Sequence, residues 1–77
     1  MDPFQVPYYT DSEGNKFKVE VIVPDFNGLA IGRVFIEGKP HYVVRWNGDT
    51  NSVGFPQSRG HPVWMLLPRG IQLSIEL

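Results

Sequence analysis

The chain has 77 residues, the length of one small domain, and it contains no cysteine, which excludes disulfides and thiolate metal sites. Its formal net charge is −1, from seven Lys and Arg against eight Asp and Glu. The hydrophobic core of so short a chain supplies only marginal stability, and small folds without disulfides often gain stability by self-association. We therefore expect a single domain over residues 1–77 that forms a homo-oligomer.

The N-terminal residues show no basic segment followed by an apolar stretch, so no signal peptide is indicated. The longest apolar run, residues 63–67, is far shorter than the about 20 residues that span a bilayer. We expect a cytoplasmic protein without a membrane partner. The basic side chains are scattered among acidic ones, so the charge balance disfavours a nucleic-acid partner.

Glycine and proline interrupt the whole chain, and the longest stretch free of both is residues 15–23. An ordinary globular helix needs about ten residues, so the spacing predicts an all-β fold. A weak edge strand is expected over residues 4–10, where Pro7 cannot donate to a ladder. Residues 16–23 are the clearest strand, and the side chains expected to share one side are Phe17, Val19, Val21 and Val23.

A reversal over residues 24–28, ending in Asn27-Gly28, leads to a hairpin of strands 31–36 and 41–46 around residues 37–40. Its pairing puts two sets of side chains on opposite faces. One set is Ile31, Arg33, Phe35, Tyr42, Val44 and Trp46, and the other is Gly32, Val34, Ile36, His41, Val43 and Arg45. Neither set is polar throughout, so we expect both faces to be at least partly covered.

Residues 47–61 are the longest irregular stretch, with a short strand expected over 52–55 and one helical turn allowed near 57–60. The chain then ends in a predicted hairpin, in which a bulged type I turn at Pro68-Arg69-Gly70 joins residues 63–67 to residues 71–77. In total, five to six short strands predict a small barrel or a curled antiparallel sheet.

The predicted C-terminal hairpin puts Val63, Met65 and Leu67 on the core side. Trp64 and Leu66 then lie on the opposite face, which is otherwise polar. Either the N-terminal segment around Phe4 covers them, or a second chain does. In the second case Trp64 and Leu66 are interface residues, and tryptophan is the type most enriched at binding hot spots.

The segment Gly32-Arg33-Val34-Phe35-Ile36, followed by Tyr42-Val43-Val44-Arg45-Trp46-Asn47-Gly48, resembles the glycine-opened and aromatic-ended strands of SH3-like barrels. Chromo-barrel, Tudor and KOW-type modules share that pattern. The resemblance covers residues 31–48. It implies an SH3-like barrel that binds a peptide, a modified lysine or a nucleic acid, although the basic character of KOW modules is missing here.

Catalysis would depend on His41 or His61, and no spacing of serine or aspartate around them indicates a triad. Two histidines without cysteine match no structural zinc spacing. The glycines of residues 28–32 precede no helix that could bind a phosphate. We therefore expect no metal, no cofactor and no catalytic residue.

Aromatic residues make up 13% of the chain. They favour a non-catalytic module that binds a protein or peptide in an aromatic groove between residues 47–61 and the N-terminal strand, as a small accessory or inhibitor protein would. Two alternatives stay open, an oligomeric mini-enzyme with its pocket on a symmetry axis and a nucleic-acid-binding barrel. The candidate ligand-binding residues are Tyr8, Tyr9, Tyr42, Arg45, Trp46, Phe55 and Arg59.

Overall fold

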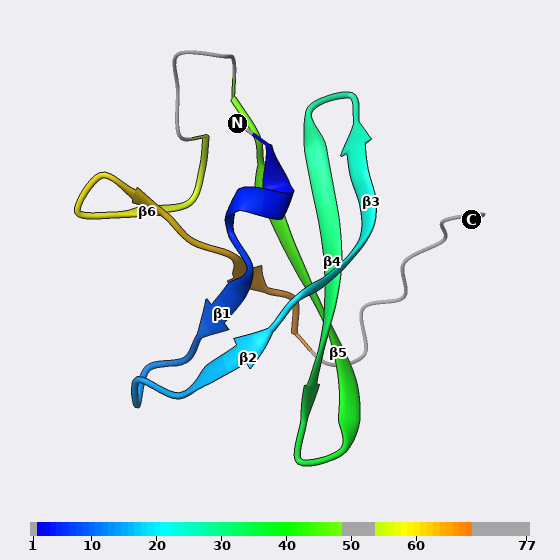
Figure 1. The fold of residues 1–77 in the computed structure, drawn as a ribbon, viewed down its shortest axis with the longest axis vertical. Helices are drawn as coiled ribbons and strands as arrows, with labels where there is room; N and C mark the ends of the chain where they lie inside the picture. The colour runs from blue at the N-terminus through cyan, green and yellow to red at the C-terminus, as the bar shows by residue number, and fades with distance from the viewer. Residues whose placement is uncertain (1, 49–53, 69–77) are drawn as a thin grey trace.

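The computed structural model of the protein describes residues 2–48 and 54–68. These residues contain eight short β-strands, one 3-10 turn and no α-helix. Figure 1 shows how the strands are arranged. The glycine and proline spacing therefore predicted the all-β class correctly. No helix in the described part of the chain is long and apolar enough to cross a membrane.

A four-stranded antiparallel sheet, in the order β3–β4–β5–β8, forms the centre of the molecule. Its strands are β3 (Glu20–Phe26), β4 (Leu29–Ile36), β5 (Lys39–Trp46) and β8 (Met65–Leu66). Asn27 and Gly28 join β3 to β4 with φ of 53° and 93°, and Glu37 and Gly38 join β4 to β5 with φ of 53° and 78°. Positive φ at both central residues is what two-residue hairpin turns of this hand require.

The β4–β5 hairpin has the predicted facing, since Ile31 pairs with Val44 and Gly32 pairs with Val43. We call the side of the sheet that carries Val43 the core face and the side that carries Val44 the outer face. On the core face the side chains of Ala30, Val34 and Val43 are all 0% exposed.

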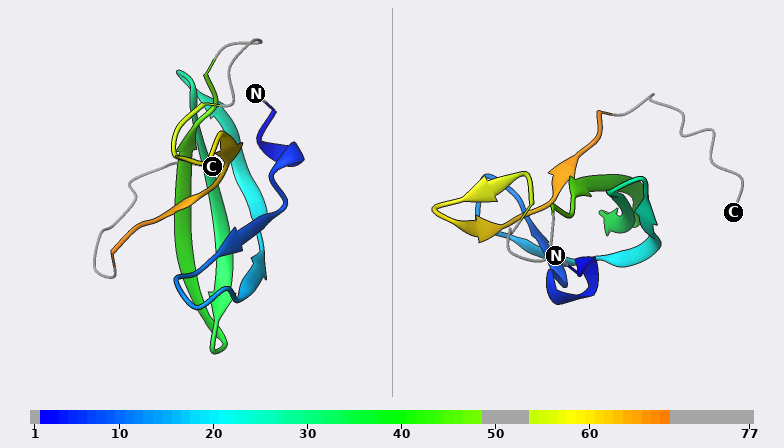
Figure 2. Two further views of the ribbon diagram at one scale, coloured as in Figure 1. Left: turned by 90° about the vertical axis from the view of Figure 1, so that its left-hand side faces the viewer. Right: turned by 90° about the horizontal axis from the view of Figure 1, so that it is seen from above.

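The N-terminal segment covers the core face. It contains the 3-10 turn η1 (Pro3–Gln5) and the paired strands β1 (Tyr8–Thr10) and β2 (Lys16–Lys18), so the strand expected over residues 4–10 is shorter than predicted. Val6, Tyr9, Phe17 and Val19 pack into the core cluster with Val34 and Val43. Figure 2 shows this segment, in blue, along one side of the curved sheet.

A β-bulge in β3 reverses the facing that alternation predicts for Val23. Val21 pairs with Gly32 on the core face, whereas Val23 pairs with Ile31 on the outer face, with a register shift between them. The prediction thus holds for Phe17, Val19 and Val21, which contact the core, and is wrong for Val23. One extra residue in a strand inverts every side chain that follows it.

The side assignment predicted for residues 63–67 is wrong. Leu66 pairs with Val43 and packs on the core, whereas Met65 pairs with Val44 and is 44% exposed. Trp64 is 4% exposed, and its Nε1 donates a hydrogen bond of 2.7 Å to the carbonyl of Val6. The N-terminal segment therefore covers Trp64, and pairing with β5 sets the facing. The expected partner, residues 71–77, lies outside the described residues.

Between β5 and β8 lies a small hairpin of β6 (Gln57–Ser58) and β7 (His61–Pro62), in place of the helical turn allowed at residues 57–60. Most of the strand expected over 52–55 lies outside the described residues, but Phe55 forms a bridge with Trp46. The described residues close no barrel, because the four-stranded sheet has β3 and β8 as its edges. Of the two expected architectures, the curled sheet is the one observed (Figure 2).

Candidate binding surface

The outer face of the four-stranded sheet gathers large apolar side chains in rows, because residues paired across antiparallel strands point to the same side. Four rows follow from the register. They are Phe55, Trp46, Leu29 and Phe26 at one end, then Met65, Val44, Ile31 and Val23, then Tyr42, Arg33 and Glu20, and finally Pro40 and Phe35.

Many of these side chains are exposed to solvent. The exposed fractions are 64% for Phe26, 59% for Phe55, 54% for Phe35, 51% for Trp46, 44% for Met65 and 37% for Tyr42. We call these six residues the outer patch. Ile31 and Val44, 3% and 7% exposed, lie between them and form its floor. The other exposed large apolar side chains of the described residues, Phe4 and Tyr8, belong to η1 and β1, which cover the opposite face.

Backbone contacts fix the Trp46 end of the outer patch. The amide of Trp46 donates to the carbonyl of Phe55 at 2.6 Å, and the amide of Phe55 donates back to Trp46 at 2.8 Å. The indole of Trp46 lies over Gly28, where a Cβ would come within 3.8 Å of its Cε3 atom. Both aromatic side chains are therefore held side by side by the tight β3–β4 turn and by the bridge.

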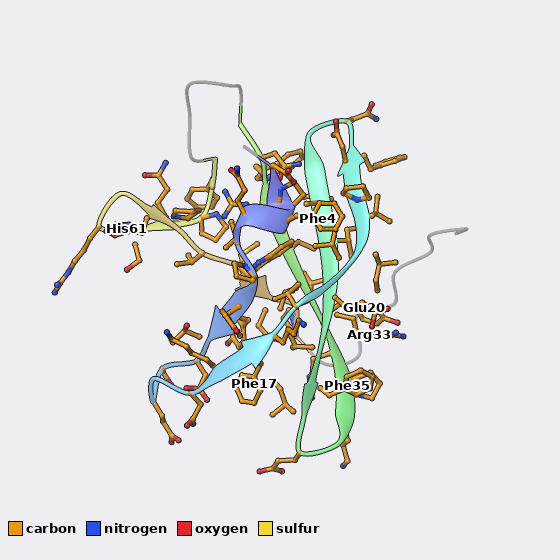
Figure 3. All side chains as sticks on the ribbon, in the orientation of Figure 1. Phe4, Phe17, Glu20, Arg33, Phe35 and His61 are labelled. Carbon is orange, nitrogen blue, oxygen red and sulfur yellow. The ribbon has the colours of Figure 1, made fainter. Side chains whose placement is uncertain are left out.

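Arg33 joins Tyr42 to Phe35 at the other end. Its Nη2 donates to both carboxylate oxygens of Glu20, at 3.1 and 3.0 Å, and its guanidinium carbon lies 5.4 Å from the centroid of the Phe35 ring. Figure 3 shows Glu20 and Arg33 side by side with Phe35 below them. This ion pair neutralises the two charged side chains of the rows, so the surface offers apolar contact without net charge.

An open hollow borders the ion pair where β2 runs into β3. Its lining comes from Lys18, Val19, Glu20, Arg33 and Phe35. Lys18 supplies a cation at the rim, while Phe35 and Val19 supply apolar walls. Phe35 is the residue that this hollow shares with the outer patch.

The structure brings together Tyr42, Trp46 and Phe55 among the predicted ligand-binding residues, but it places Tyr8 and Tyr9 elsewhere. Tyr9 packs on the core and stacks on Phe17 with ring centroids 6.2 Å apart. Tyr8 is 50% exposed, with the Lys16 ammonium 6.0 Å from its ring centroid. The groove expected between the N-terminal strand and residues 47–61 is therefore not one surface in the described residues.

The two predicted arginines also lie away from the outer patch. Arg45 is 0% exposed and donates to the carbonyls of Val63 at 2.8 Å and of Trp46 at 3.4 Å. Desolvation of its buried guanidinium lowers the pKa of Arg45. It ties β5 to the segment before β8 and has no surface left for a ligand. Arg59 is exposed at the β6–β7 turn with φ of 53°.

The predicted interface pair, Trp64 and Leu66, belongs to the core face. Only 4% of the surface of Trp64 is exposed, so almost none of it can contact a second chain in this conformation.

The two histidines differ in burial, since His41 is partly buried and His61 is exposed. The described residues contain no group of three or more His, Cys, Asp or Glu that could hold a metal ion.

Sequence analysis missed Phe26, Phe35 and Met65. The alternation of Phe35 with Val34 did place Phe35 on the face of Tyr42 and Trp46, which is a usable signal. The sequence gives no such signal for Phe26 and Met65, because the side to which each points depends on the bulge in β3 and on the pairing of β8.

Comparisons with models of protein families, with curated proteins and with solved structures found no match to this chain.

Proposed function

We propose that this protein is a non-catalytic interaction module that binds a protein or peptide through the outer patch. The observation that supports this most directly is the collection of six large apolar side chains, 37% to 64% exposed, on one sheet face. Monomeric soluble proteins rarely expose apolar patches larger than a few hundred Å², and those that do commonly bind a partner there. Aromatic residues and methionine are also the types enriched at interfaces.

The polar groups of the surface agree with contact rather than with catalysis. Glu20 and Arg33 are bonded to each other, at 3.0 and 3.1 Å, so the two charged side chains of the rows are paired with each other at the Phe35 end of the surface. Paired charges at the margin of an apolar surface are a normal interface feature, since they orient a partner without a large desolvation cost.

Peptide selection tests the proposal. A library of random peptides is displayed against the protein immobilised at low density, and selected peptides are measured on the double variant Phe35→Thr/Tyr42→Thr. Threonine keeps strand propensity while removing the ring. We expect peptides rich in apolar residues whose affinity falls at least tenfold in the variant, because two aromatic contacts are lost.

The chain offers a closely matched control. Phe4→Thr/Tyr8→Thr removes the same two side-chain types from positions that are 62% and 50% exposed on the covered side of the sheet. We expect it to bind the selected peptides as the wild type does. Failure to enrich any peptide, or equal weakening by both double variants, would count against the outer patch as a binding surface.

A further inference from the structure

We infer that the partner of the outer patch is a second copy of this chain, packed face to face across a two-fold axis. The inference rests on the proposed function, because it names the occupant of the same surface. Three properties of the described residues lead to it: the size of the patch, its charge, and the small core that the sheet has on its other side.

The exposed area of the patch is what a small symmetric dimer needs. A buried aromatic side chain contributes about 150–250 Å². With Met65 counted like the five aromatic side chains, six side chains that are 37% to 64% exposed offer about 600 Å² per copy, or about 1,200 Å² for a pair. Specific interfaces start at about this total area. A face-to-face pair thus reaches the lower end of the range with the outer patch alone.

The charge of the surface permits a copy to meet itself. In a two-fold interface each patch faces the same patch, so an unpaired charge near the axis would meet its own like charge. Here Arg33 and Glu20 neutralise each other within one chain. The whole chain has a formal charge of −1, which gives little repulsion at long range.

The core on the opposite face of the sheet is small, so burial of the outer patch would add substantially to the stability of the fold. Among the described residues, the buried side chains of the core cluster are four valines, one alanine and one tryptophan, namely Val6, Val19, Val34, Val43, Ala30 and Trp64. Residues 2–19 already cover that core face, so the outer face is the apolar surface still available. Two sheets packed through these faces, about 10 Å apart, would form a sandwich with a second core.

Sedimentation velocity over a range of concentrations tests the inference, with the wild type and the two double variants described above. We expect the wild type to be a dimer with a dissociation constant in the micromolar range, because interfaces at the low end of the size range belong mostly to weak complexes. Phe35→Thr/Tyr42→Thr should weaken the dimer at least tenfold with an unchanged circular dichroism spectrum, since each substitution occurs twice in the pair. Phe4→Thr/Tyr8→Thr should remain dimeric.

Other outcomes overturn the inference in different ways. A wild-type monomer at all concentrations that still binds the selected peptides would refute the second copy while the proposed function stands. A monomer that binds peptides only after residues 71–77 are removed would identify that segment as the occupant. A dimer that both double variants retain would place the interface elsewhere, and a monomer that selects no peptide would refute both proposals.

Discussion

Gly54 leaves less room for a side chain than Gly14, Gly28, Gly32, Gly38 or Gly60, the other glycines whose surroundings the structure describes. Its φ is 75°, and a Cβ would meet the carbonyl oxygen of Trp46 and, at 2.7 Å, Nη2 of Arg45. A left-handed conformation costs other residues about 1–2 kcal/mol, and overpacking adds about 1–3 kcal/mol. We expect Gly54→Ala to lower the free energy of unfolding by about 2–5 kcal/mol in urea denaturation.

A substitution at Gly60 measures the cost of the left-handed conformation without the cost of overpacking. Its φ of 78° matches that of Gly54, but no atom lies within 4 Å of its Cβ position. Gly60→Ala should therefore cost only the conformational part, about 1–2 kcal/mol. Equal losses for both substitutions would show that the crowding around Gly54 has no energetic weight.

Asp11 makes the stability depend on pH. The side-chain amide of Asn15 donates to its Oδ2 at 3.1 Å and the backbone amide to its Oδ1 at 2.8 Å, and these bonds lower the pKa of Asp11. A carboxyl with a lowered folded pKa stabilises the fold above its unfolded pKa, and that contribution is lost as the pH falls through the folded value.

We therefore expect Asp11→Asn, which keeps an acceptor oxygen but cannot ionise, to melt at a lower temperature than the wild type near neutral pH. The difference should begin to close as the pH falls below about 4, the ordinary pKa of an aspartate, and should vanish once the pH is below the lowered pKa of the folded state, where the wild-type carboxyl is also neutral. Thermal melting followed by circular dichroism at several pH values measures it. A gap that stays constant down to the lowest pH would show that ionisation of Asp11 is irrelevant to the turn.

Arg45 shows how far single residues could be predicted. Alternation correctly put it on the face of Val43, but both faces of the hairpin carry apolar residues. The sequence therefore could not say which face was buried. The structure places Arg45 with the core, 0% exposed, and leaves Tyr42 and Trp46 in solvent. A charged residue in an alternating strand is normally assigned to the exposed side, and here that rule fails.

At the scale of elements, Trp64 links the N-terminal segment to β8, the strand that begins directly after Trp64. Trp64→Phe keeps the apolar ring but removes the hydrogen bond to Val6. Loss of a bond to a buried acceptor costs about 1–3 kcal/mol. We expect that loss in urea denaturation, together with faster amide exchange in η1 and β1. Unchanged exchange in these elements would mean that the bond does not hold the N-terminal segment in place.

The elements whose facing was predicted wrongly share one physical cause. Residues 21–23 and 63–67 are apolar at every position, so a shift by one residue exchanges apolar side chains for apolar side chains. Register is weakly specified by sequence in such runs. The bulge after Val21 and the exposure of Met65 follow from pairing with distant strands, which local alternation does not contain.

At the scale of the whole molecule, glycine and proline content predicted the fold class better than the alternation of apolar residues predicted the order of the strands. Glycine and proline excluded ordinary helices, and this alone established the all-β class. The order β3–β4–β5–β8 required long-range pairing of a two-residue strand with β5, for which no turn or alternation gives a signal. The outer patch needed long-range pairing in part. Alternation placed Phe35, Tyr42 and Trp46 on one face, but Phe26, Phe55 and Met65 join them only through the register of β3, the bridge to Trp46 and the pairing of β8.

The irregular edge of β3 limits how molecules of this protein can aggregate. Pro24 has no amide hydrogen, and its carbonyl already accepts from Nδ2 of Asn47 at 2.9 Å. The register of β3 also shifts twice, between Val21 and Val23 and between Val23 and Phe26. A strand from another molecule would find an interrupted ladder along this edge. Growth of the sheet strand by strand, which leads to amyloid fibres, is therefore blocked on the β3 side whatever occupies the outer face.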